Sequence, residues 1–294
     1  MVKMKNSKIR IKSYPYYFLL PALIIYFVFY LLPTVLGFGY SFTDWSAYGE
    51  TINFVGFEQF KKIFQDPVIL ICLRNTLLYA IGTAFLQNFL ALVLAVLLDN
   101  QIKLSKVYRA LFFFPAILTP LIVGYVFQGI FQYDGIFNTA LSFFGLGDAV
   151  INWLGDARSS LFIVILVAVW YGTGLHMTIY LAALQGVPED IIEAAKLDGA
   201  TGFQTLIYVK LKLITAGFTV NIIYSIINSL KVFGIVFVLT GGGPGRATAV
   251  FNTYIFENFS EGMFGYASAI GTLSFLMICL IAFPVMFYLK RKEG

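Results

Sequence analysis

Six long runs of uncharged, mostly apolar residues constrain this chain more than any other feature. With 59% hydrophobic and only 12% charged residues, the 294-residue sequence is far more apolar than a water-soluble domain. A helix needs about 20 apolar residues to cross a bilayer, and each run is close to that length or longer. The runs are 13–43, 75–98, 110–133, 159–188, 213–230 and 262–289. The sequence therefore predicts an all-α, polytopic membrane protein with six transmembrane helices.

All six runs belong to one membrane domain, residues 14–289, flanked by short termini at 1–13 and 290–294. A seventh uncharged run, 232–245, is short and ends in glycines and a proline. We interpret it as an external loop or a re-entrant segment. The basic N-terminus resembles a signal peptide, but its apolar run is too long and no Ala-x-Ala-like site follows. We expect it to be retained as the first span.

Lysine and arginine are unevenly divided between the two sides that six spans define. If the N-terminus is inside, fourteen of the 20 basic residues lie on internal segments and six on external ones. Basic residues accumulate on the cytoplasmic side of membrane proteins. We therefore expect both termini and the segment 186–212 to be cytoplasmic. The net charge of +5 follows from this topology and does not indicate nucleic-acid binding.

The segment 186–212, between the fourth and fifth runs, is densely charged. Pro188 suits the first position of a helix, and the helix dipole favours the two acids that follow it. Gly199 can close that helix in a left-handed conformation. Thr201 and Gln204 match a capping box that opens a second helix. The pattern predicts two short helices joined at a rigid turn, a lever that couples the membrane domain to something outside the bilayer.

The inventory of reactive side chains argues against catalysis, a metal site and nucleotide binding. His176 is the one histidine, and Cys72 and Cys279 are far apart in sequence. The glycine-rich stretch 241–246 lacks the Gly-Lys-Ser/Thr of a phosphate-binding loop. No Asp or Glu lies in the six runs, which argues against an ion-coupled carrier. We expect this chain to bind no cofactor.

Polar side chains recur along the fifth run at spacings that place most of them on one helical face. Two interpretations stay open. These residues could hydrogen-bond to neighbouring helices, each bond contributing about 0.6 kcal/mol, or they could line a path for a polar solute. They are Asn221, Ser225, Asn228 and Ser229, with Tyr224 beside them.

The fourth run carries Trp170, Tyr171 and Tyr180, which could stack on a sugar ring. Aromatic residues near span ends more often pack or lie at the membrane interface. His176, deep in the same run, is better explained as a hydrogen-bonded packing residue than as a proton carrier.

The charged segment resembles the docking signature of the membrane-spanning permease subunits of ATP-binding-cassette importers, in the carbohydrate branch that includes the maltose and glycerol-phosphate systems. That signature reads Glu-Ala-Ala, three residues, Gly, nine residues, then Ile-x-Leu-Pro. Val209 stands for the isoleucine and Leu211 matches, but Lys212 replaces the proline, a departure that bears on the usual break before the fifth span. The matching residues are Glu193, Ala194, Ala195 and Gly199, with the branch-typical Asp198 and Ala200.

The resemblance covers nearly the whole chain. Residues 54–60 and 74–76 look like the family's first external loop, and 152–154 resemble the second. Residues 239–244, followed by 265–269, are similar to the last external loop of the carbohydrate branch. These elements occur in the family's order and in the predicted topology.

The resemblance implies a set of partners in a bacterial or archaeal plasma membrane. They are a second permease subunit forming a heterodimer, two ATPase subunits that hold ATP and Mg²⁺, an external solute-binding protein, and lipid. The implied function is alternating-access import of a sugar or oligosaccharide, driven by ATP hydrolysis on the partners, so the chain itself is not an enzyme. A non-sugar solute such as a glycerol phosphodiester is the alternative, with an ion-coupled carrier more distant.

Roles for individual residues follow from the same resemblance. The docking helix, with Glu193 and the alanines after it, would enter a cleft in an ATPase. The external loop of Gly241, Gly242, Gly243 and Pro244 would face the binding protein. Substrate contacts in related systems come from the fourth and fifth spans, which favours Tyr171, Leu175, Ser225, Asn228 and Ser229; Asn221 joins them from the polar face.

Overall fold

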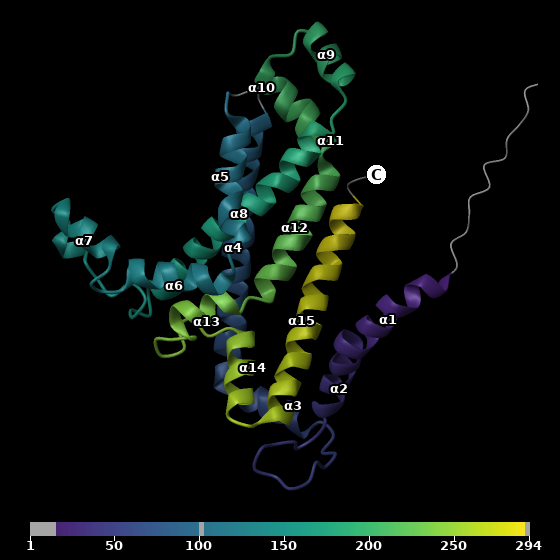
Figure 1. Cartoon of the computed structure of the whole chain (residues 1–294), viewed down its shortest axis with the longest axis vertical. Coiled ribbons are helices and arrows are strands. Elements are labelled where there is room, and N and C mark those ends of the chain that lie inside the picture. Colours follow the sequence, from purple (N-terminus) through teal and green to yellow (C-terminus); the bar gives the residue numbers. More distant parts are fainter. Residues whose placement is uncertain (1–15, 100–102, 292–294) are drawn as a thin grey trace, which may run out of the picture.

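The computed structural model describes residues 16–99 and 103–291, and these ranges are helical apart from loops and one isolated bridge between Thr43 and Phe54. Residues 1–13 and most of 290–294, the two predicted termini, lie outside the described residues. Along the chain (Figure 1) the helices are η1 (Tyr16–Leu19), α1 (Leu20–Tyr26), η2 (Phe27–Leu31), α2 (Leu32–Tyr40), α3 (Glu58–Gln65), α4 (Pro67–Asp99), α5 (Ser105–Ile117), α6 (Pro120–Phe131), α7 (Ile136–Phe143), η3 (Gly147–Ala149), α8 (Ser160–Gln185), α9 (Glu189–Leu197), α10 (Gly202–Gln204), η4 (Thr205–Lys210), α11 (Leu211–Leu213), α12 (Thr215–Leu230), α13 (Gly234–Thr240), α14 (Phe251–Ser260) and α15 (Phe264–Lys290).

Four of these helical stretches are long and apolar enough to cross a membrane, namely Tyr17–Tyr40, α4, α8 and α15. Two bent pairs raise the number to six if each pair is one span. One pair is α5 with α6 and α7, and the other is the arm Gly202–Leu213 with α12. Each of the six coincides with one predicted run, and the all-α prediction is confirmed.

The second span starts earlier than the predicted residue 75, because the helix α4 begins at Pro67. Proline is well suited to a first helical position. Asp66 caps the helix, its Oδ1 accepting from the Val68 amide at 2.9 Å. The exposed Arg74 is therefore an internal residue of the helix and not its boundary.

The third run, predicted as one span over 110–133, is sharply bent. Its two halves, α5 and the helices that follow, meet at a bend of 95°, and α6 and α7 project sideways from the bundle (Figure 1). The bend lies at Leu118 and Thr119, which are both extended. A residue before proline is disfavoured in the helical region, so Pro120 ends one helix and opens the next. Thr119 caps the new helix by accepting from the Ile122 amide at 3.3 Å.

The core of the molecule is the bundle of α4, α8, α12 and α5. Small residues let the helices approach closely, as is usual in membrane bundles. Ala91 and Ala95 of α4 are fully buried in a cluster with Met177 and Tyr180 of α8. At Gly174 the backbones of α8 and α5 nearly touch, since a Cβ there would lie 2.0 Å from the Phe112 carbonyl oxygen.

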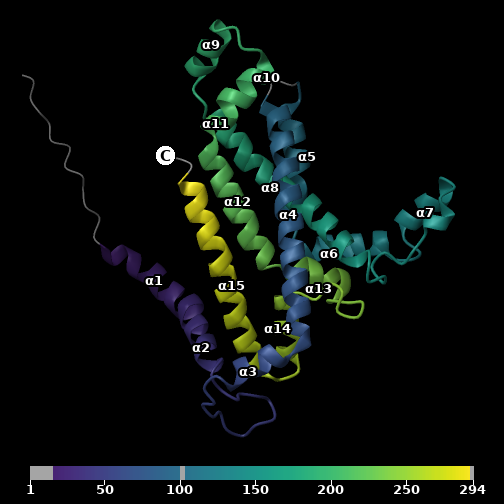
Figure 2. The same ribbon diagram turned by 180° about the vertical axis from the view of Figure 1, so that it is seen from behind.

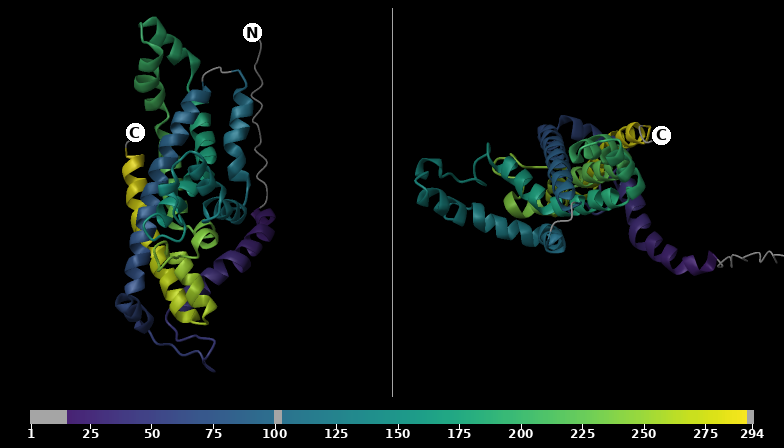
Figure 3. Two further views of the ribbon diagram at one scale, coloured as in Figure 1. Left: turned by 90° about the vertical axis from the view of Figure 1, so that its left-hand side faces the viewer. Right: turned by 90° about the horizontal axis from the view of Figure 1, so that it is seen from above.

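The N-terminal span leaves this bundle. In Figures 2 and 3 α1 diverges from the other helices, and none of its most apolar window is buried. Contact is kept through α2, where the Phe38 ring meets Phe275 of α15 edge to face at 5.4 Å.

The bundle has two distinct ends. One, called here the α9 end, carries the segment 186–212 and the last residue of α4. The other, the α14 end, carries α3, α14 and the first turn of α15 (Figure 1). The run 232–245 begins with the short buried helix α13 and continues into the glycine-rich loop. The helix α14, which follows that loop and packs on α15, was not predicted.

Candidate functional site

A cavity of about 380 Å³ lies where α4, α8 and α12 meet the bend between α5 and α6 and the start of α13. Its walls combine aromatic, amide and hydroxyl side chains with aliphatic ones, and Lys231 is the charged residue among the lining groups. Of the predicted substrate-lining residues, four are in this wall. They are Tyr171 and Leu175 of α8 with Asn228 and Ser229 of α12.

The polar face of α12 holds residues that bond to neighbouring helices and residues that line the cavity, and Ser229 does both. Asn221, Ser225 and Ser229 are buried and bond to other helices. Asn228 is exposed, lines the cavity and donates only to the Tyr224 carbonyl at 2.9 Å in its own helix. Asn228 and Tyr224 therefore present polar groups toward the hollow of the cavity, whereas Asn221 and Ser225 lie outside its lining.

A ladder of hydrogen bonds ties α12 to α8 and α4. Asn221 Oδ1 and His176 Nδ1 are 2.8 Å apart, and Asn221 Nδ2 donates to the His176 carbonyl at 2.9 Å. Asn88 Nδ2 donates to Ser225 Oγ at 2.9 Å, and Tyr180 donates to Asn88 Oδ1 at 2.8 Å. The last rung is Thr83 Oγ1 to Ser229 Oγ at 2.8 Å. His176 is thus buried and hydrogen-bonded between helices, as interpreted from the sequence.

Tyr171 has two contacts that place it at the cavity wall. Its ring lines the cavity, while its hydroxyl donates at 3.2 Å to the carbonyl of Leu118, a residue at the proline bend. Bends of this kind leave carbonyls that neighbouring helices must satisfy. Trp170 points elsewhere and packs edge to face on Phe127 at 5.0 Å, and Tyr180 is buried in the ladder.

The α4 side of the cavity was missed by reasoning from the sequence. Tyr79 and Gln87 line it, and Gln87 Nε2 donates to the Ala168 carbonyl at 2.8 Å. Thr83, Gln87 and Asn88 are polar residues inside an apolar span, which is itself a functional signal. The second run, 75–98, contains these polar residues as the fifth run contains its own, so the same search for polar side chains inside an apolar run would have found them.

The predicted lever is present at the α9 end, with one correction. The first helix, α9, begins at Glu189, so Pro188 is its N-cap and not its first residue. Gly199 has the left-handed φ of +83° and closes the helix. The amide of Ala200 donates to the Ala195 carbonyl at 3.0 Å and that of Gly199 to the Lys196 carbonyl at 3.1 Å, the pattern of a Schellman cap.

The capping box of the second helix is confirmed. Gln204 Oε1 accepts from the Thr201 amide at 2.8 Å, and Thr201 Oγ1 accepts from the Gln204 amide at 3.3 Å. The arm then runs through η4 and α11 to a bend of 67° before α12. The break before the fifth span is therefore kept without the family proline. It falls at Ile214, two residues after Lys212.

Most of the surface of α9 is exposed, and none of its nine residues is fully buried. Ile192 is half-buried against the hydrophobic cluster that includes Leu184, Val187 and Ile214. Leu197 is 89% exposed despite its apolar side chain. The predicted docking residues Glu193, Ala194, Asp198 and Gly199 are also exposed, and Ala195 and Ala200 are half-buried.

The glycine-rich loop at the α14 end is held by side chains on both flanks. Gly241 and Gly242 have positive φ values of 59° and 94°. Thr248 Oγ1 lies 2.6 Å from Thr240 Oγ1 and donates to the Gly243 carbonyl at 2.8 Å. The loop therefore has a defined shape, with Gly241, Gly243 and Pro244 lining an open depression.

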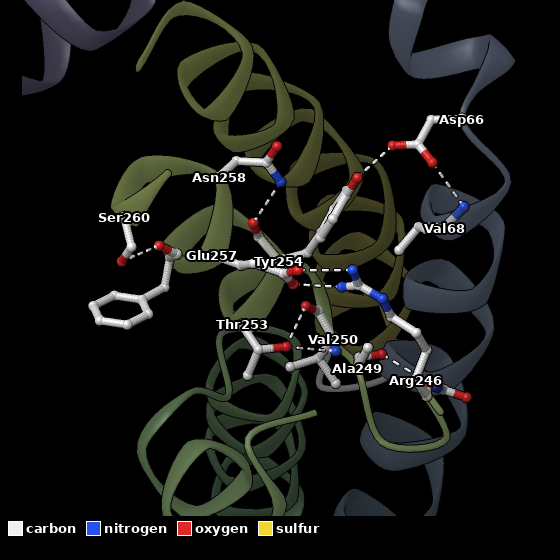
Figure 4. A network of polar contacts seen from close by, with 12 residues as sticks. Asp66, Val68, Arg246, Ala249, Val250, Thr253, Tyr254, Glu257, Asn258 and Ser260 are labelled. Atoms are coloured by element: carbon white, nitrogen blue, oxygen red, sulfur yellow. Dashed lines mark hydrogen bonds and ion pairs between the residues drawn. The ribbon is translucent and has the colours of Figure 1, made fainter. Parts of the chain in front are cut away.

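Arg246 anchors the end of that loop. It forms a two-pronged ion pair with Glu257 of α14, with Nη2 to Oε1 at 2.7 Å, and its guanidinium lies over the Tyr254 ring (Figure 4). The hydrogen bonds with Glu257 raise the pKa of Arg246 above its ordinary value. Asn75 of α4 donates to the Arg246 carbonyl at 3.1 Å and to the Ala249 carbonyl at 3.0 Å.

Asp66 joins the same network from the other side. Its Oδ2 accepts from the hydroxyl of Tyr254 at 2.6 Å (Figure 4). The same oxygen accepts from the hydroxyl of Tyr266 at 2.7 Å. Burial raises the pKa of this carboxyl, but the two hydroxyls, the Val68 amide and the Arg246 charge outweigh burial, so the pKa is lowered. The carboxylate is thus a fixed acceptor that ties α4 to α14 and α15.

Comparison with known proteins identifies the family. The sequence profile described as "Binding-protein-dependent transport system inner membrane component" matches residues 87–293. The chain belongs to this family. As a member of a membrane transport family it is a transport subunit and not an enzyme, and transport in this family depends on a binding protein.

Two relatives and one solved structure show how far the likeness extends. The probable ABC transporter permease protein YurN of Bacillus subtilis is 31% identical over 96% of this chain and 98% of its own length. The multiple sugar-binding transport system permease protein MsmF of Streptococcus mutans is 30% identical over 95% and 96%. A subunit in the crystal structure of a bacterial alginate ABC transporter with an alginate pentasaccharide-bound periplasmic protein has a TM-score of 0.82 at 22% identity, over 95% of this chain and 94% of that one. The last likeness establishes the fold.

Proposed function

We propose that this chain is one permease subunit of a carbohydrate importer, forming with a second permease the path for a sugar or oligosaccharide. An external binding protein delivers the solute, and ATP hydrolysis on two partner ATPases drives transport. The MsmF relative is named for multiple sugars, and the structural neighbour for alginate, a polysaccharide. The cavity supplies aromatic rings and amides, groups that suit sugar rings and hydroxyls.

One observation carries the proposal. The segment 186–212 connects α8 directly to α12, and those two helices supply the cavity residues Tyr171 and Asn228. A displacement of α9 therefore acts on both walls, on α8 through the short connection 186–188 and on α12 through the Schellman cap at Gly199, the arm and the bend at Ile214. ATP-driven motion outside the membrane is thereby linked to the shape of the cavity.

The same geometry assigns the two ends. We take the α9 end as cytoplasmic, where the basic residues gather and where an ATPase would receive Glu193, the following alanines and Leu197. The α14 end is then external, and the loop Gly241–Pro244 would face the binding protein. ATP and Mg²⁺ would be held by the ATPases alone.

For the solute we assign contact to Tyr171, Leu175, Asn228 and Ser229, together with Tyr224. Asn221 and Ser225 are assigned to helix positioning instead, because neither lines the cavity and both are paired in the ladder. Asn228 is the most exposed amide of this set and is the best single probe of solute contact.

The test is uptake by proteoliposomes that contain this chain with the second permease, the ATPases and the binding protein of the same importer. ATP-dependent uptake of a neutral or acidic oligosaccharide, with none of a glycerol phosphodiester, supports the proposal. Asn228→Ala should lower the rate of uptake without reducing the amount of assembled complex. Uptake of the phosphodiester alone would refute the carbohydrate assignment, and ATP hydrolysis by the purified chain without partners would refute its role as a passive transport subunit.

A further inference from the structure

The end of α4 that faces the arm Gly202–Leu213 is bound to it by a half-buried ion pair. Lys210 Nζ, in the arm, lies 2.6 Å from Asp99 Oδ2, the last residue of α4. Their side chains are only 21% and 11% exposed, so this is the most buried of the three ion pairs among the described residues. Neither residue belongs to the docking signature, and neither lines the cavity.

The position of Asp99 is unfavourable without its partner. The carboxyl end of a helix carries a partial negative charge, which disfavours an acid in the last turn. Lys210 compensates for this charge from a different element, 111 residues away in sequence. The attraction to Lys210 offsets the unfavourable position of the acid, so the helix α4 itself gains little stability from the pair. What the pair adds is a fixed contact between the arm and α4.

Arg109 of α5 supports the same end. Its Nη2 lies 3.5 Å from the Leu98 carbonyl oxygen. The amide of Gln185, the last residue of α8, is satisfied only with its oxygen toward this guanidinium, at 2.7 Å from Nη2. The carboxyl ends of α4 and α8 are thus tied to α5 as well as to the arm, and a lost ion pair would leave the rest of the bundle assembled.

Apolar packing alone does not fix the position of the arm along α4. Leu98, Leu211 and Ile214 share one hydrophobic cluster across the same contact. Such burial is non-directional and allows helices to slide over each other. An ion pair with its partners at 2.6 Å instead fixes one point of the arm to one point of α4.

We propose that Asp99 and Lys210 are positioning residues that fasten the docking arm to α4, so that movement of the arm reaches a third wall of the cavity. The inference rests on the proposed function and extends it by a direct contact between the arm and α4, in addition to the ladder that joins α4 to α8 and α12. α4 supplies Tyr79 and Gln87 to the cavity. It also supplies Thr83 and Asn88 to the ladder.

The direct test measures the distance between arm and α4 and needs no solute. Spin labels are placed at Phe203 and Leu90, both exposed, in a background with Cys72→Ala and Cys279→Ala, and the complex with its ATPases is studied nucleotide-free and vanadate-trapped. With the pair intact, the distance distribution stays the same in both states. With Lys210→Met it should shift or broaden on trapping. An unchanged distribution in that variant would overturn the proposal.

A second measurement asks whether the contact serves transport. In Lys210→Met and Asp99→Asn, solute imported per ATP hydrolysed should fall by about 5- to 150-fold, the usual range for coupling between sites. The exchange Asp99→Lys with Lys210→Asp should restore most of it. Lys62→Met, which breaks the exposed Glu58–Lys62 pair, is the matched control and should change nothing.

Two outcomes would overturn the proposal. A purely structural role would lower uptake and hydrolysis together, and a charge exchange could fail to restore coupling in an assembled complex. If the wild-type complex imports no carbohydrate, the proposed function fails, while the label distances still decide this inference.

Discussion

At the α14 end the glycine-rich loop is fixed by an ion pair and side-chain hydrogen bonds within the chain, whereas at the α9 end the helix α9 is mostly exposed and packs on the bundle through Ile192. Arg246 is paired with Glu257, its carbonyl is bonded by Asn75, and Asp66 closes the network from α4. The helix α9, by contrast, has no buried residue. The polar groups of the loop at the α14 end are paired within the chain, whereas α9 exposes the apolar side chain of Leu197 to its surroundings.

The difference indicates how each end would meet a partner. A preformed loop can be recognised without ordering cost, since its shape is already determined by the chain. A compact helix with an exposed apolar residue is typical of a surface that binds another protein. The internal order of α9 is nevertheless high, because the Gly199 cap and the Thr201–Gln204 box fix its geometry. The helix α9 is therefore fixed in its own geometry and largely exposed, with Ile192 half-buried against the bundle.

The largest effect is expected from Leu197→Glu. The side chain is 89% exposed, so the fold should tolerate a charge, with a change in stability of about 0.5 kcal/mol or less. Association with the ATPases should be lost, because a carboxylate would be buried in an apolar contact. Co-purification of the ATPases with the membrane subunits measures this. Tyr48→Glu is the control, an 83% exposed apolar residue in the loop before α3, and should leave co-purification intact.

A smaller effect separates the two kinds of polar residue on α12. Asn221→Ala removes the partner of His176 and leaves buried polar atoms unpaired, which should lower the free energy of unfolding by about 1–3 kcal/mol. Asn228→Ala, on the exposed side of the same helix, should leave that stability unchanged. Thermal unfolding in detergent compares them. Equal losses in both variants would contradict the division between ladder and cavity.

The smallest effect concerns the network around Asp66. Its pKa is lowered in the folded state, so the stability it contributes is fully present above the ordinary value of 3.8 and is lost as the pH falls through the lowered pKa. Asp66→Asn should cost about 1 kcal/mol at pH 7, because the carboxylate is partly exposed to water. The gap in unfolding temperature between wild type and variant should close below pH 3.8. A gap that persists in acid would show that charge is not what holds this end together.

The six spans and the two short helices of the docking segment could be predicted from the sequence because each depends on local information. Run length determines the spans, and Gly199, Thr201 and Gln204 determine the caps. The bend at Thr119 was less accessible, since prolines at 115 and 120 predict distortion but not its angle. The cavity wall from α4 was missed because Gln87 and Thr83 acquire their partners from α8 and α12, far along the chain. The ion pair of Asp99 with Lys210 is of the same kind.

The central claim is that the rigid turn at Gly199 links the ATPases to the cavity, and two glycines allow it to be tested at equal backbone cost. Gly199 and Gly56 have φ values of +83° and +60°, and a Cβ at either meets no atom of the chain within 4 Å. Replacing either by leucine therefore costs about 1–2 kcal/mol of backbone strain and little else within the fold. In proteoliposomes with all partners, Gly199→Leu should abolish both uptake and the stimulation of ATP hydrolysis by loaded binding protein, while Gly56→Leu retains both. Normal uptake and normal stimulation in Gly199→Leu, or an equal loss in the two variants, would contradict the account.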